Sequence, residues 1–473
     1  MLYAVLSESR LRALLLFGLL AALAVPGTVF AQGGAADAIS TPLHYPSAPG
    51  ILFIPPSNQQ QPLKQGQKFV AHTNIEVFVP SGLEPDEEPP YPGYGYETPA
   101  SIACHYGLVS TGQYPNCNPN LTTVNPTGGS NSIAVVDAYD DPSAPGDLAW
   151  FSLQFGLPLK SKQFQVVWAN PISSTCYRGT VPIDYTGGWE IEEATDIEWA
   201  HAMAPNATLY LVEACSPLDY DLKAAVLVAS NLVQCGQTEI DPNTGVLGTC
   251  PKNSTGKGEV SMSWGGNEFV GENGSDGCAI LDDSCFTTPY VVYFASSGDS
   301  PGVSWPGTSV NAVSAGGTTI RRNALSFNFI QEAAWTFTGG GQSAIEPIPN
   351  YQSSIAGIVG KWRGVPDWSF DADPYTGVYV YDTFPIQGFE YLEWLIVGGT
   401  SVSAPSLAGI ENASGIFHSS SNLQLQVIYA NKGITADFTD IQAGFCGNYM
   451  GFTAGSGWDF CTGVGVDNSY KGK

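Results

Sequence analysis

Ser401 lies in a glycine-rich turn ahead of a helical run, where it could act as a nucleophile. The segment 398–405 reads GGTSVSAP, and apolar residues at helical spacing follow it. A hydroxyl at such a turn can meet backbone N–H donors and the positive end of the helix dipole, which stabilise a developing oxyanion. The same position also suits a serine that merely caps the helix. The turn alone leaves both interpretations open.

A serine nucleophile needs a general base, and no histidine of the chain stands in a short His-Gly motif that would supply one. The histidines are His44, His72, His105, His201 and His418. His201 is the nearest helical candidate, but it lies nine residues from Glu192, about half a turn off its face. An ordinary Ser-His-Asp triad is therefore not expected, and the base must be another kind of group.

Two carboxylates in the helical run 189–205 could take that role. Glu192 and Asp196 are four residues apart, so both side chains lie on one face of the predicted helix. A solvated acidic face, where like charges repel by roughly 0.2–0.5 kcal/mol, is the alternative. The flanking Ile197 and Ala200 instead favour a buried helix, in which paired carboxylates must share a proton.

The C-terminal segment carries a second group of oxygen ligands. Asp440 and Ile441 are followed by the segment 454–459, AGSGWD, which ends in Asp459. Carboxylates, together with carbonyls presented by glycines, are hard ligands that suit calcium and not zinc. An acidic, glycine-rich loop without any metal is the ordinary alternative.

These residues lie among short apolar, β-branched runs that alternate with helical patterns. The predicted strands are 132–137, 164–168, 208–212, 259–263, 290–295 and 312–315, and the predicted helices are 189–203, 218–233 and 403–417. Continuous apolar strands separated by helices are typical of a parallel sheet that is covered on both faces. The pattern predicts one doubly wound α/β domain from about residue 97 to 467.

Charge and cysteine content limit the partners and the compartment. The 17 basic residues stand against 43 acidic ones, a net charge of −26, so the basic surface that nucleic acid needs is absent. An anionic membrane would also repel the chain. Ten cysteines without a C-x-x-C motif are expected to form disulfides in an oxidising compartment. Proximity pairs Cys104 with Cys117, Cys176 with Cys215, Cys235 with Cys250, Cys278 with Cys285 and Cys446 with Cys461, although connectivity stays open.

The first 31 residues are predicted to be a cleaved signal peptide. Arg10 and Arg12 precede the apolar stretch 13–25, and the small residue Ala31 precedes a cut before Gln32. A membrane anchor is the alternative, but the apolar run is short for a span. We therefore expect export to the extracellular or periplasmic space, with an N-terminal extension and linker at 32–96 and the main domain at 97–473.

The segment 196–205, DIEWAHAMAP, resembles the catalytic helix of the sedolisin family of serine-carboxyl peptidases, which also has a glutamate at the position of Glu192. Further segments match that family in the same order: 136–142 (VDAYDDP), 260–266 (VSMSWGG), 294–300 (FASSGDS), 364–377 (GVPDWSFDADPYTG) and the serine segment. The resemblance covers about residues 97–465. It implies a subtilisin-like α/β fold, with a doubly wound, mainly parallel sheet and helices on both faces.

The resemblance also implies a role for each candidate residue. Ser401 would be the nucleophile, Glu192 its general base, and Asp196 the residue that orients Glu192. Asp299, in its protonated form, would donate a hydrogen bond to the oxyanion. Two more residues would extend the carboxyl network, and five would hold one structural calcium ion. The network residues are Asp137 and Trp264, and the calcium ligands are Asp440, Asp459 and the carbonyls of Ile441, Gly455 and Gly457.

The sequence thus predicts a secreted, acid-acting serine-carboxyl endopeptidase that forms an acyl-enzyme on Ser401. It would act as a monomer on proteins or peptides. One departure is that sedolisins have a large folded prosegment, for which about 65 residues are too few. The alternative is a catalytically silent, secreted sedolisin-like binding domain. A carbohydrate-active enzyme using Glu192 and Asp196 is disfavoured, because its carboxyls must face a substrate from opposite sides.

Overall fold

The computed structural model describes residues 49–82, 88–110, 116–170, 174–177, 179–236, 250, 254–388, 393–447 and 451–473. Residues from Pro46 to the C-terminus form one compact unit. The predicted signal peptide lies outside the described residues. Within the described ranges, no helix combines the length and the apolar character that crossing a bilayer requires.

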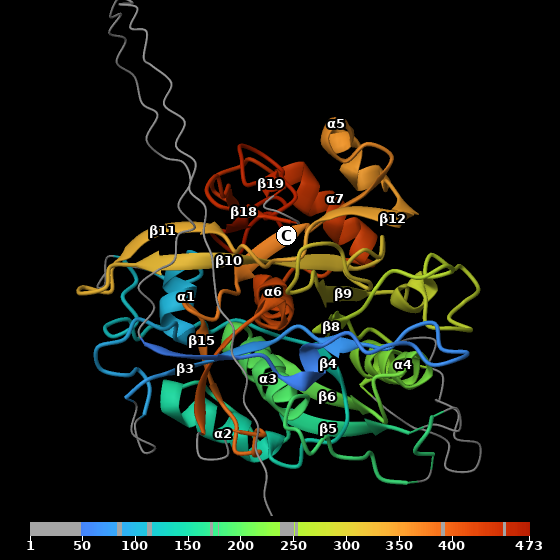
Figure 1. Cartoon of the computed structure of the whole chain (residues 1–473), viewed down its shortest axis with the longest axis horizontal. Helices are drawn as coiled ribbons and strands as arrows, with labels where there is room; N and C mark the ends of the chain where they lie inside the picture. The colour runs from blue at the N-terminus through green and yellow to red at the C-terminus, as the bar shows by residue number, and fades with distance from the viewer. Residues whose placement is uncertain are drawn as a thin grey trace, which may run out of the picture. The chain divides into compact units, whose positions relative to one another are not determined.

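An eight-stranded sheet forms the centre of this unit (Figure 1). All its strand pairs are parallel except the pair between β10 and β11. All six predicted strands are present, with bounds shifted by at most a few residues except at the C-terminal end of β10. In spatial order the strands are β11 (Phe329–Ala334), β10 (Val313–Arg322), β9 (Val291–Ser296), β7 (Gly258–Met262), β4 (Ser132–Ala138), β6 (Thr208–Ala214) and β5 (Phe164–Ala169), and β14 (Trp368–Asp371) also pairs with β10.

Helices cover both faces of the sheet, because successive side chains of a strand point to opposite sides. On β4, Ile133 and Val135 belong to the core that contains α3 (Glu190–Met203) and α6 (Thr400–Ser414). The alternate residues of β4 pack instead with α4 (Asp219–Cys235). The predicted doubly wound fold is therefore confirmed, and α6 begins three residues earlier than predicted.

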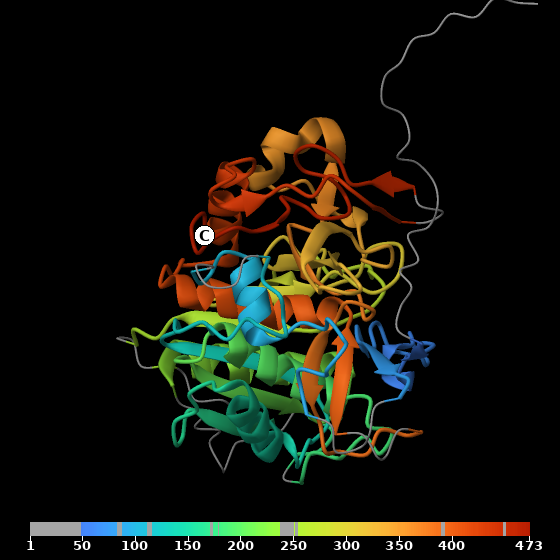
Figure 2. The ribbon, with the colours of Figure 1, turned by 90° about the vertical axis from the view of Figure 1, so that its left-hand side faces the viewer.

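A second, antiparallel sheet joins the N-terminal stretch to the strand that precedes Ser401. Its order is β1, β3, β16, β15, and Figure 2 shows the blue N-terminal strands beside the orange β15 and β16. Residues 50–80, which fall in the predicted extension, therefore hydrogen-bond to strands of the main unit. The bounds are β1 (Gly50–Phe53), β3 (Glu76–Pro80), β16 (Trp394–Gly398) and β15 (Val378–Tyr381), and a separate pair consists of β2 (His72–Thr73) and β8 (Trp264–Gly265).

Shorter elements and disulfides complete the unit. The five cysteine pairs predicted from proximity are all present as disulfides. The other helices are α1 (Pro99–His105), α2 (Ala144–Phe155), α5 (Ala356–Val359) and α7 (Ser421–Asn431), with 3-10 turns η1 (Pro56–Asn58), η2 (Asp283–Phe286) and η3 (Asn350–Ile355). The other strands are β12 (Gly341–Pro347), β13 (Trp362–Val365), β17 (Phe438–Thr439), β18 (Phe445–Cys446), β19 (Phe452–Thr453) and β20 (Val466–Asp467).

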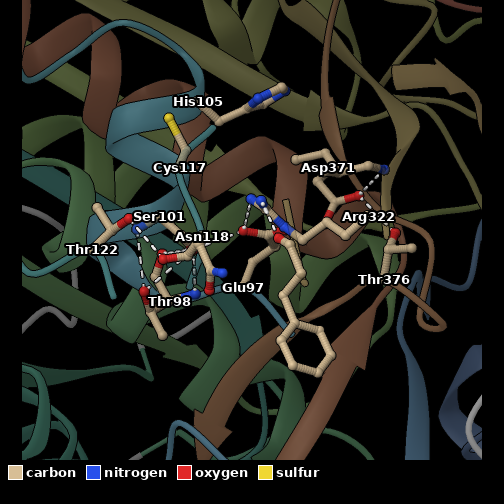
Figure 3. A network of polar contacts seen from close by, with 12 residues as sticks. Glu97, Thr98, Ser101, His105, Cys117, Asn118, Thr122, Arg322, Asp371 and Thr376 are labelled. Atoms are coloured by element: carbon tan, nitrogen blue, oxygen red, sulfur yellow. Dashed lines mark hydrogen bonds and ion pairs between the residues drawn. The ribbon is translucent and has the colours of Figure 1, made fainter. Parts of the chain in front are cut away.

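A buried ion pair attaches the start of α1 to the central sheet (Figure 3). Arg322 of β10 donates from Nε and Nη2 to the two carboxylate oxygens of Glu97, with 2.8 Å between Nη2 and Oε2. The hydroxyl of Ser101 donates to the same carboxylate at 2.7 Å. Both charged side chains are at most 5% exposed, so removing one partner leaves the other charge buried without compensation.

We expect Arg322→Met to lower the free energy of unfolding by about 3–5 kcal/mol, because Glu97 would keep a buried charge without its cation. Urea unfolding followed by tryptophan fluorescence measures the change. The exposed Lys361 provides the control, since Lys361→Met removes a cation that is in water. Equal stability of the two variants would contradict the role given to the ion pair.

Candidate active site

Helix α3 carries five acidic side chains, and all of them are buried. They are Glu190, Glu192, Glu193, Asp196 and Glu198. The helix lies between the sheet and the helices α2 and α6, so its acidic face does not reach solvent. The alternative of a solvated acidic face does not describe this helix.

Glu192, Asp196 and Asp137 form one group of interacting carboxyls. Burial raises the pKa of Glu192 well above its usual value, and the charges of Asp196 and Asp137 raise it further. Burial and the charge of Asp137 raise the pKa of Asp196 in the same way. The pKa of Asp137 rises to about 8 through burial. Three buried carboxyls this close cannot all be ionised, so the group titrates as a set that shares protons.

Ser401 lies in the first turn of α6, directly after Gly399 and Thr400. Its hydroxyl donates to the backbone carbonyl of Ser263 at 3.0 Å and accepts from the backbone N–H of Asn74 at 3.2 Å. The hydroxyl also interacts with Glu192 closely enough to lower the pKa of that carboxyl. No described hydrogen bond of good geometry joins the two side chains, since both oxygens of Glu192 lack one. Rotation of the hydroxyl proton about the Cβ–Oγ bond decides which acceptor it uses.

Asp299 follows β9 and faces the same turn. Its Oδ1 accepts from the backbone N–H of Thr400 at 2.7 Å and from the Thr400 hydroxyl at 2.9 Å. Its Oδ2 is buried and has no hydrogen-bond partner among the described residues. Burial raises the pKa of Asp299 well above its usual value, and the charge of Glu76 raises it further. A protonated Asp299 would therefore present a donor into the space beside Gly399.

The space between Asp299 and Ser401 exists because residue 399 is glycine. Gly399 has φ +102°, which disfavours other residues. A Cβ at this position would clash with the backbone carbonyl oxygen of Asn74 and with Oδ2 of Asp299. The backbone N–H of Ser401 donates to that same Asn74 carbonyl at 3.0 Å. The Ser401 N–H thus donates to one carbonyl oxygen, and the Asp299 carboxyl lies beside Gly399 near the same oxygen, as two donors of an oxyanion hole would be placed.

Trp264 lies next to this group and contacts the strand that carries Asp137. Its indole N–H donates to the backbone carbonyl of Val136 at 2.8 Å. The two carboxylate oxygens of Asp137 have no hydrogen-bond partner in the described part of the chain. Trp264 therefore orients the end of β4, which carries Asp137, and does not contact that carboxyl by a described hydrogen bond.

Sequence reasoning missed a second group of buried carboxyls beside the first. Glu193 faces Glu213 and Asp141. Burial raises the pKa of Glu193 well above its usual value, and the charges of these two neighbours raise it further. Burial raises the pKa of Glu213 to about 10 and that of Asp141 to about 7. The signal that could have found it is Glu213 at the end of the apolar run TLYLVEA, since an acid there must be buried with the strand.

The C-terminal loop brings the two predicted carboxylate ligands to the same short segment. Oδ2 of Asp440 accepts from the backbone N–H of Gly457, and Oδ2 of Asp459 accepts from that of Gly455, both at 3.0 Å. Among the described residues, no group of three or more acidic, histidine or cysteine side chains could hold a metal ion. A cation here would therefore need backbone carbonyls, such as that of Ile441, besides the two carboxylates.

Known proteins resemble this chain in sequence and in fold, although no protein-family model matches it. It is 30% identical over 240 residues to sedolisin of Pseudomonas sp. strain 101, covering 44% of this chain and 38% of that protein. It is also 30% identical over 235 residues to kumamolisin of Bacillus sp. strain MN-32, covering 44% of this chain and 40% of that protein. The matches thus span about two fifths of each relative.

A solved structure supports the fold assignment. It is Pseudomonas sedolisin, described as a serine-carboxyl proteinase in complex with two molecules of pseudo-iodotyrostatin. The TM-score is 0.56 at 21% identity, and the alignment covers 79% of this chain and 95% of that one. At this identity the likeness shows a shared fold.

We expect the stability of the protein to fall as the pH rises from about 4 to about 9. A carboxyl whose pKa is raised by folding stabilises fully below its unfolded pKa, which is about 4. That stabilisation is lost as the pH rises through the folded pKa, about 8 for Asp137 and about 9 for Glu190. Calorimetry at constant ionic strength measures the melting temperature across this range.

The substitution Glu213→Gln supplies the control, because an amide cannot ionise. It should flatten the decline of the melting temperature at the alkaline end of the range, where Glu213 would otherwise lose its proton. A melting temperature that rises steadily with pH in the unsubstituted protein would contradict the burial of neutral carboxyls.

Proposed function

We propose that this chain, which is similar to sedolisins in sequence and fold, is an acid-acting serine-carboxyl endopeptidase that hydrolyses proteins or peptides. The observation that carries the proposal is that the Ser401 N–H donates to the backbone carbonyl of Asn74 and the Ser401 hydroxyl accepts from the N–H of the same residue, with Oδ2 of Asp299 beside the same glycine, Gly399. The Glu192 carboxyl interacts with the same hydroxyl. A nucleophile, a base and two oxyanion donors at one carbonyl are the groups that acyl transfer needs.

Glu192 is the general base in this proposal. It accepts the Ser401 proton as Oγ attacks the carbonyl carbon, and it returns that proton to the leaving amine. The resulting ester on Ser401 is then hydrolysed by water, for which Glu192 again serves as base. The three interacting carboxyls of Glu192, Asp196 and Asp137 must together lose one proton before Glu192 can accept a proton from Ser401. Asp196 and Asp137 therefore set the pH at which the base becomes available.

Asp299 supplies the second oxyanion donor. Its free Oδ2 must carry a proton to donate, and burial favours that protonated form. As the pH rises, ionisation would replace a donor by a negative charge beside the developing oxyanion. The reaction is therefore proposed for acid conditions, under which Asp299 keeps its proton.

We also propose one structural calcium ion in the C-terminal loop. The donor set fits a hard cation, because Asp440 and Asp459 both reach the loop that contains Gly455 and Gly457. The carbonyls of Ile441, Gly455 and Gly457 would complete the set. The ion would fix the loop that the disulfide between Cys446 and Cys461 also closes, and it would take no part in bond breaking.

We propose further that the protein is secreted and works as a monomer. Five disulfides in the described residues are consistent with an oxidising compartment. The acidic composition, with 43 acidic against 17 basic residues, argues against nucleic acid or anionic membranes as partners.

Ser401→Ala and Glu192→Ala should each reduce kcat/KM on denatured casein at acid pH by about 10³-fold or more. The double variant should be hardly worse than either, because nucleophile and base act as a unit. Release of acid-soluble peptides measures the rate, and Ser275→Ala at an exposed serine is the control. Unchanged activity in Ser401→Ala would remove this serine from the mechanism.

Activity should follow a bell-shaped pH profile with its maximum below pH 7. The rise of activity at low pH reports loss of the first proton from the three interacting carboxyls of Glu192, Asp196 and Asp137. The fall of activity at higher pH reports ionisation of Asp299. In Asp299→Asn the amide donates at every pH, so its residual activity should persist closer to neutral pH. Initial rates across the pH range measure both profiles, and a maximum above pH 7 in the unsubstituted protein would contradict the carboxyl mechanism.

Removal of calcium with a chelator should lower the melting temperature, since an ion that binds only the folded form stabilises it by mass action. Asp440→Asn should lower the melting temperature and make it insensitive to the chelator. Elemental analysis of washed protein should find one calcium per chain. Protein that lacks calcium and melts identically with and without chelator would refute the site.

A further inference from the structure

The N-terminal segment crosses the candidate active site as an additional strand. β2 pairs antiparallel with β8, so His72 lies opposite Gly265 and Thr73 opposite Trp264. On the other side, the backbone N–H of Ala71 donates to the carbonyl of Pro217 at 2.9 Å. The segment is thus extended and held by backbone hydrogen bonds between two other segments. Peptides that bind to proteins by strand addition are held in the same way.

Asn74 places its backbone carbonyl where a bond to be cleaved would lie. Its carbonyl oxygen accepts from the Ser401 N–H at 3.0 Å, and its own N–H donates to the Ser401 hydroxyl at 3.2 Å. That oxygen also lies beside the Asp299 carboxyl, because one Cβ at Gly399 would meet both. The carbonyl therefore occupies the candidate oxyanion hole, with the nucleophile next to it.

The side chain of Asn74 is bound as well. Its Nδ2 donates to the hydroxyl of Ser296, at the end of β9, at 2.6 Å, and both side chains are buried. Ser296 is two residues before Gly298 and three before Asp299, so this pocket adjoins the oxyanion hole. It accepts a small polar amide at the position preceding the bond.

The residues on both sides of the Asn74 carbonyl are held by side chains of Ser57 and Asn58. Asn58 donates from Nδ2 to the carbonyl of Ile75 at 2.7 Å, and the hydroxyls of Ser57 and Thr73 are 2.9 Å apart. Further out, β1 pairs with β3 from Phe53 opposite Val77 onward. A cut between Asn74 and Ile75 would therefore leave the two new ends attached to each other and to the unit.

We propose that residues 54–75 form a tethered inhibitor loop that binds the candidate active site as a substrate does, with the peptide bond between Asn74 and Ile75 as its reactive bond. This inference rests on the proposed function. It assigns control of the site to a short loop within the folded unit.

The reactive bond would open and close in place. Ser401 Oγ bonds to the carbonyl carbon of Asn74, the bond to the Ile75 nitrogen breaks, and the Ser401 proton passes through Glu192 to that nitrogen. Water then hydrolyses the ester to give the Asn74 carboxylate and free Ser401. Because Asn58 holds Ile75, the new amine stays beside the acyl group, which favours the reverse reaction over release.

The loop competes with any other substrate for the same groups. An external peptide can bind only to molecules in which the loop has left the site. Its apparent affinity is therefore the affinity for the open site multiplied by the fraction of molecules that are open. Weakening the contacts behind the loop should therefore improve the binding of external peptides without changing the residues that would cleave them.

The first test measures binding in the Ser401→Ala chain, where no cleavage is possible. The probe is a fluorescent peptide of residues 69–75, FVAHTNI, followed by anisotropy. Adding Ser57→Ala and Asn58→Ala should tighten binding about five- to tenfold, because the loop loses two hydrogen bonds that hold its bound form. Adding Gln59→Ala, at an exposed neighbour in the same loop, should leave the affinity unchanged, and melting temperatures confirm that each variant is folded.

The second test uses the chain with Ser401 intact at acid pH. Denaturing gels and N-terminal sequencing should reveal a fragment that begins at Ile75, while both fragments elute together under native conditions. The Ser57→Ala, Asn58→Ala variant should raise kcat/KM on casein by about the same factor as it tightens peptide binding.

The outcomes separate the two proposals. Equal peptide affinity in the loosened and control variants overturns the inhibitor loop, whether or not the chain hydrolyses casein. Tighter peptide binding without any hydrolysis of casein overturns the proposed function and the reactive bond, while supporting the loop as the occupant of the cleft. Hydrolysis of casein with no cut between Asn74 and Ile75 overturns the reactive bond alone.

Discussion

The burial of acidic side chains on α3 is the constraint on which the rest of the structure depends. A carboxylate taken out of water without a cation is so costly that the group keeps its proton instead. The described residues around Glu192, Asp196 and Asp137 supply no lysine or arginine to offset the charge. The fold therefore tolerates this helix only when most of its carboxyls are neutral, and stability and proton transfer depend on the same equilibrium.

The central sheet explains how residues distant in sequence reach this helix. Asp137 is the last but one residue of β4, Ser263 follows β7, and Ser296 and Asp299 lie at and beyond the end of β9. These strands are parallel neighbours, so their carboxyl ends meet at one edge, which is where α/β proteins place their sites. Ser401 enters the same edge from the antiparallel sheet through β16, so two sheets jointly position Ser401 and the residues around it.

Much of this arrangement could be predicted from the sequence, because the signals were local. Apolar runs identified the core strands, the spacing of Glu192 and Asp196 put them on one helical face, and proximity paired the cysteines. The contact of Asn74 with Ser401 spans 327 residues and uses backbone groups, which every residue possesses, so no residue type indicated it. The burial of Glu193 likewise depends on its packing toward Glu213 of β6 and Asp141, which helical periodicity cannot reveal.

The register between β3 and β16 has a mechanical consequence. Glu76 lies opposite Gly398, so the strand that continues from the Asn74 carbonyl is hydrogen-bonded to the strand that leads into Ser401. A shift of one strand relative to the central sheet would be transmitted to the other through these hydrogen bonds. The Asn74 carbonyl and Ser401 are thus linked through two paired strands, so residues 54–75 can leave the site while β3 stays paired with β16 and guides their return.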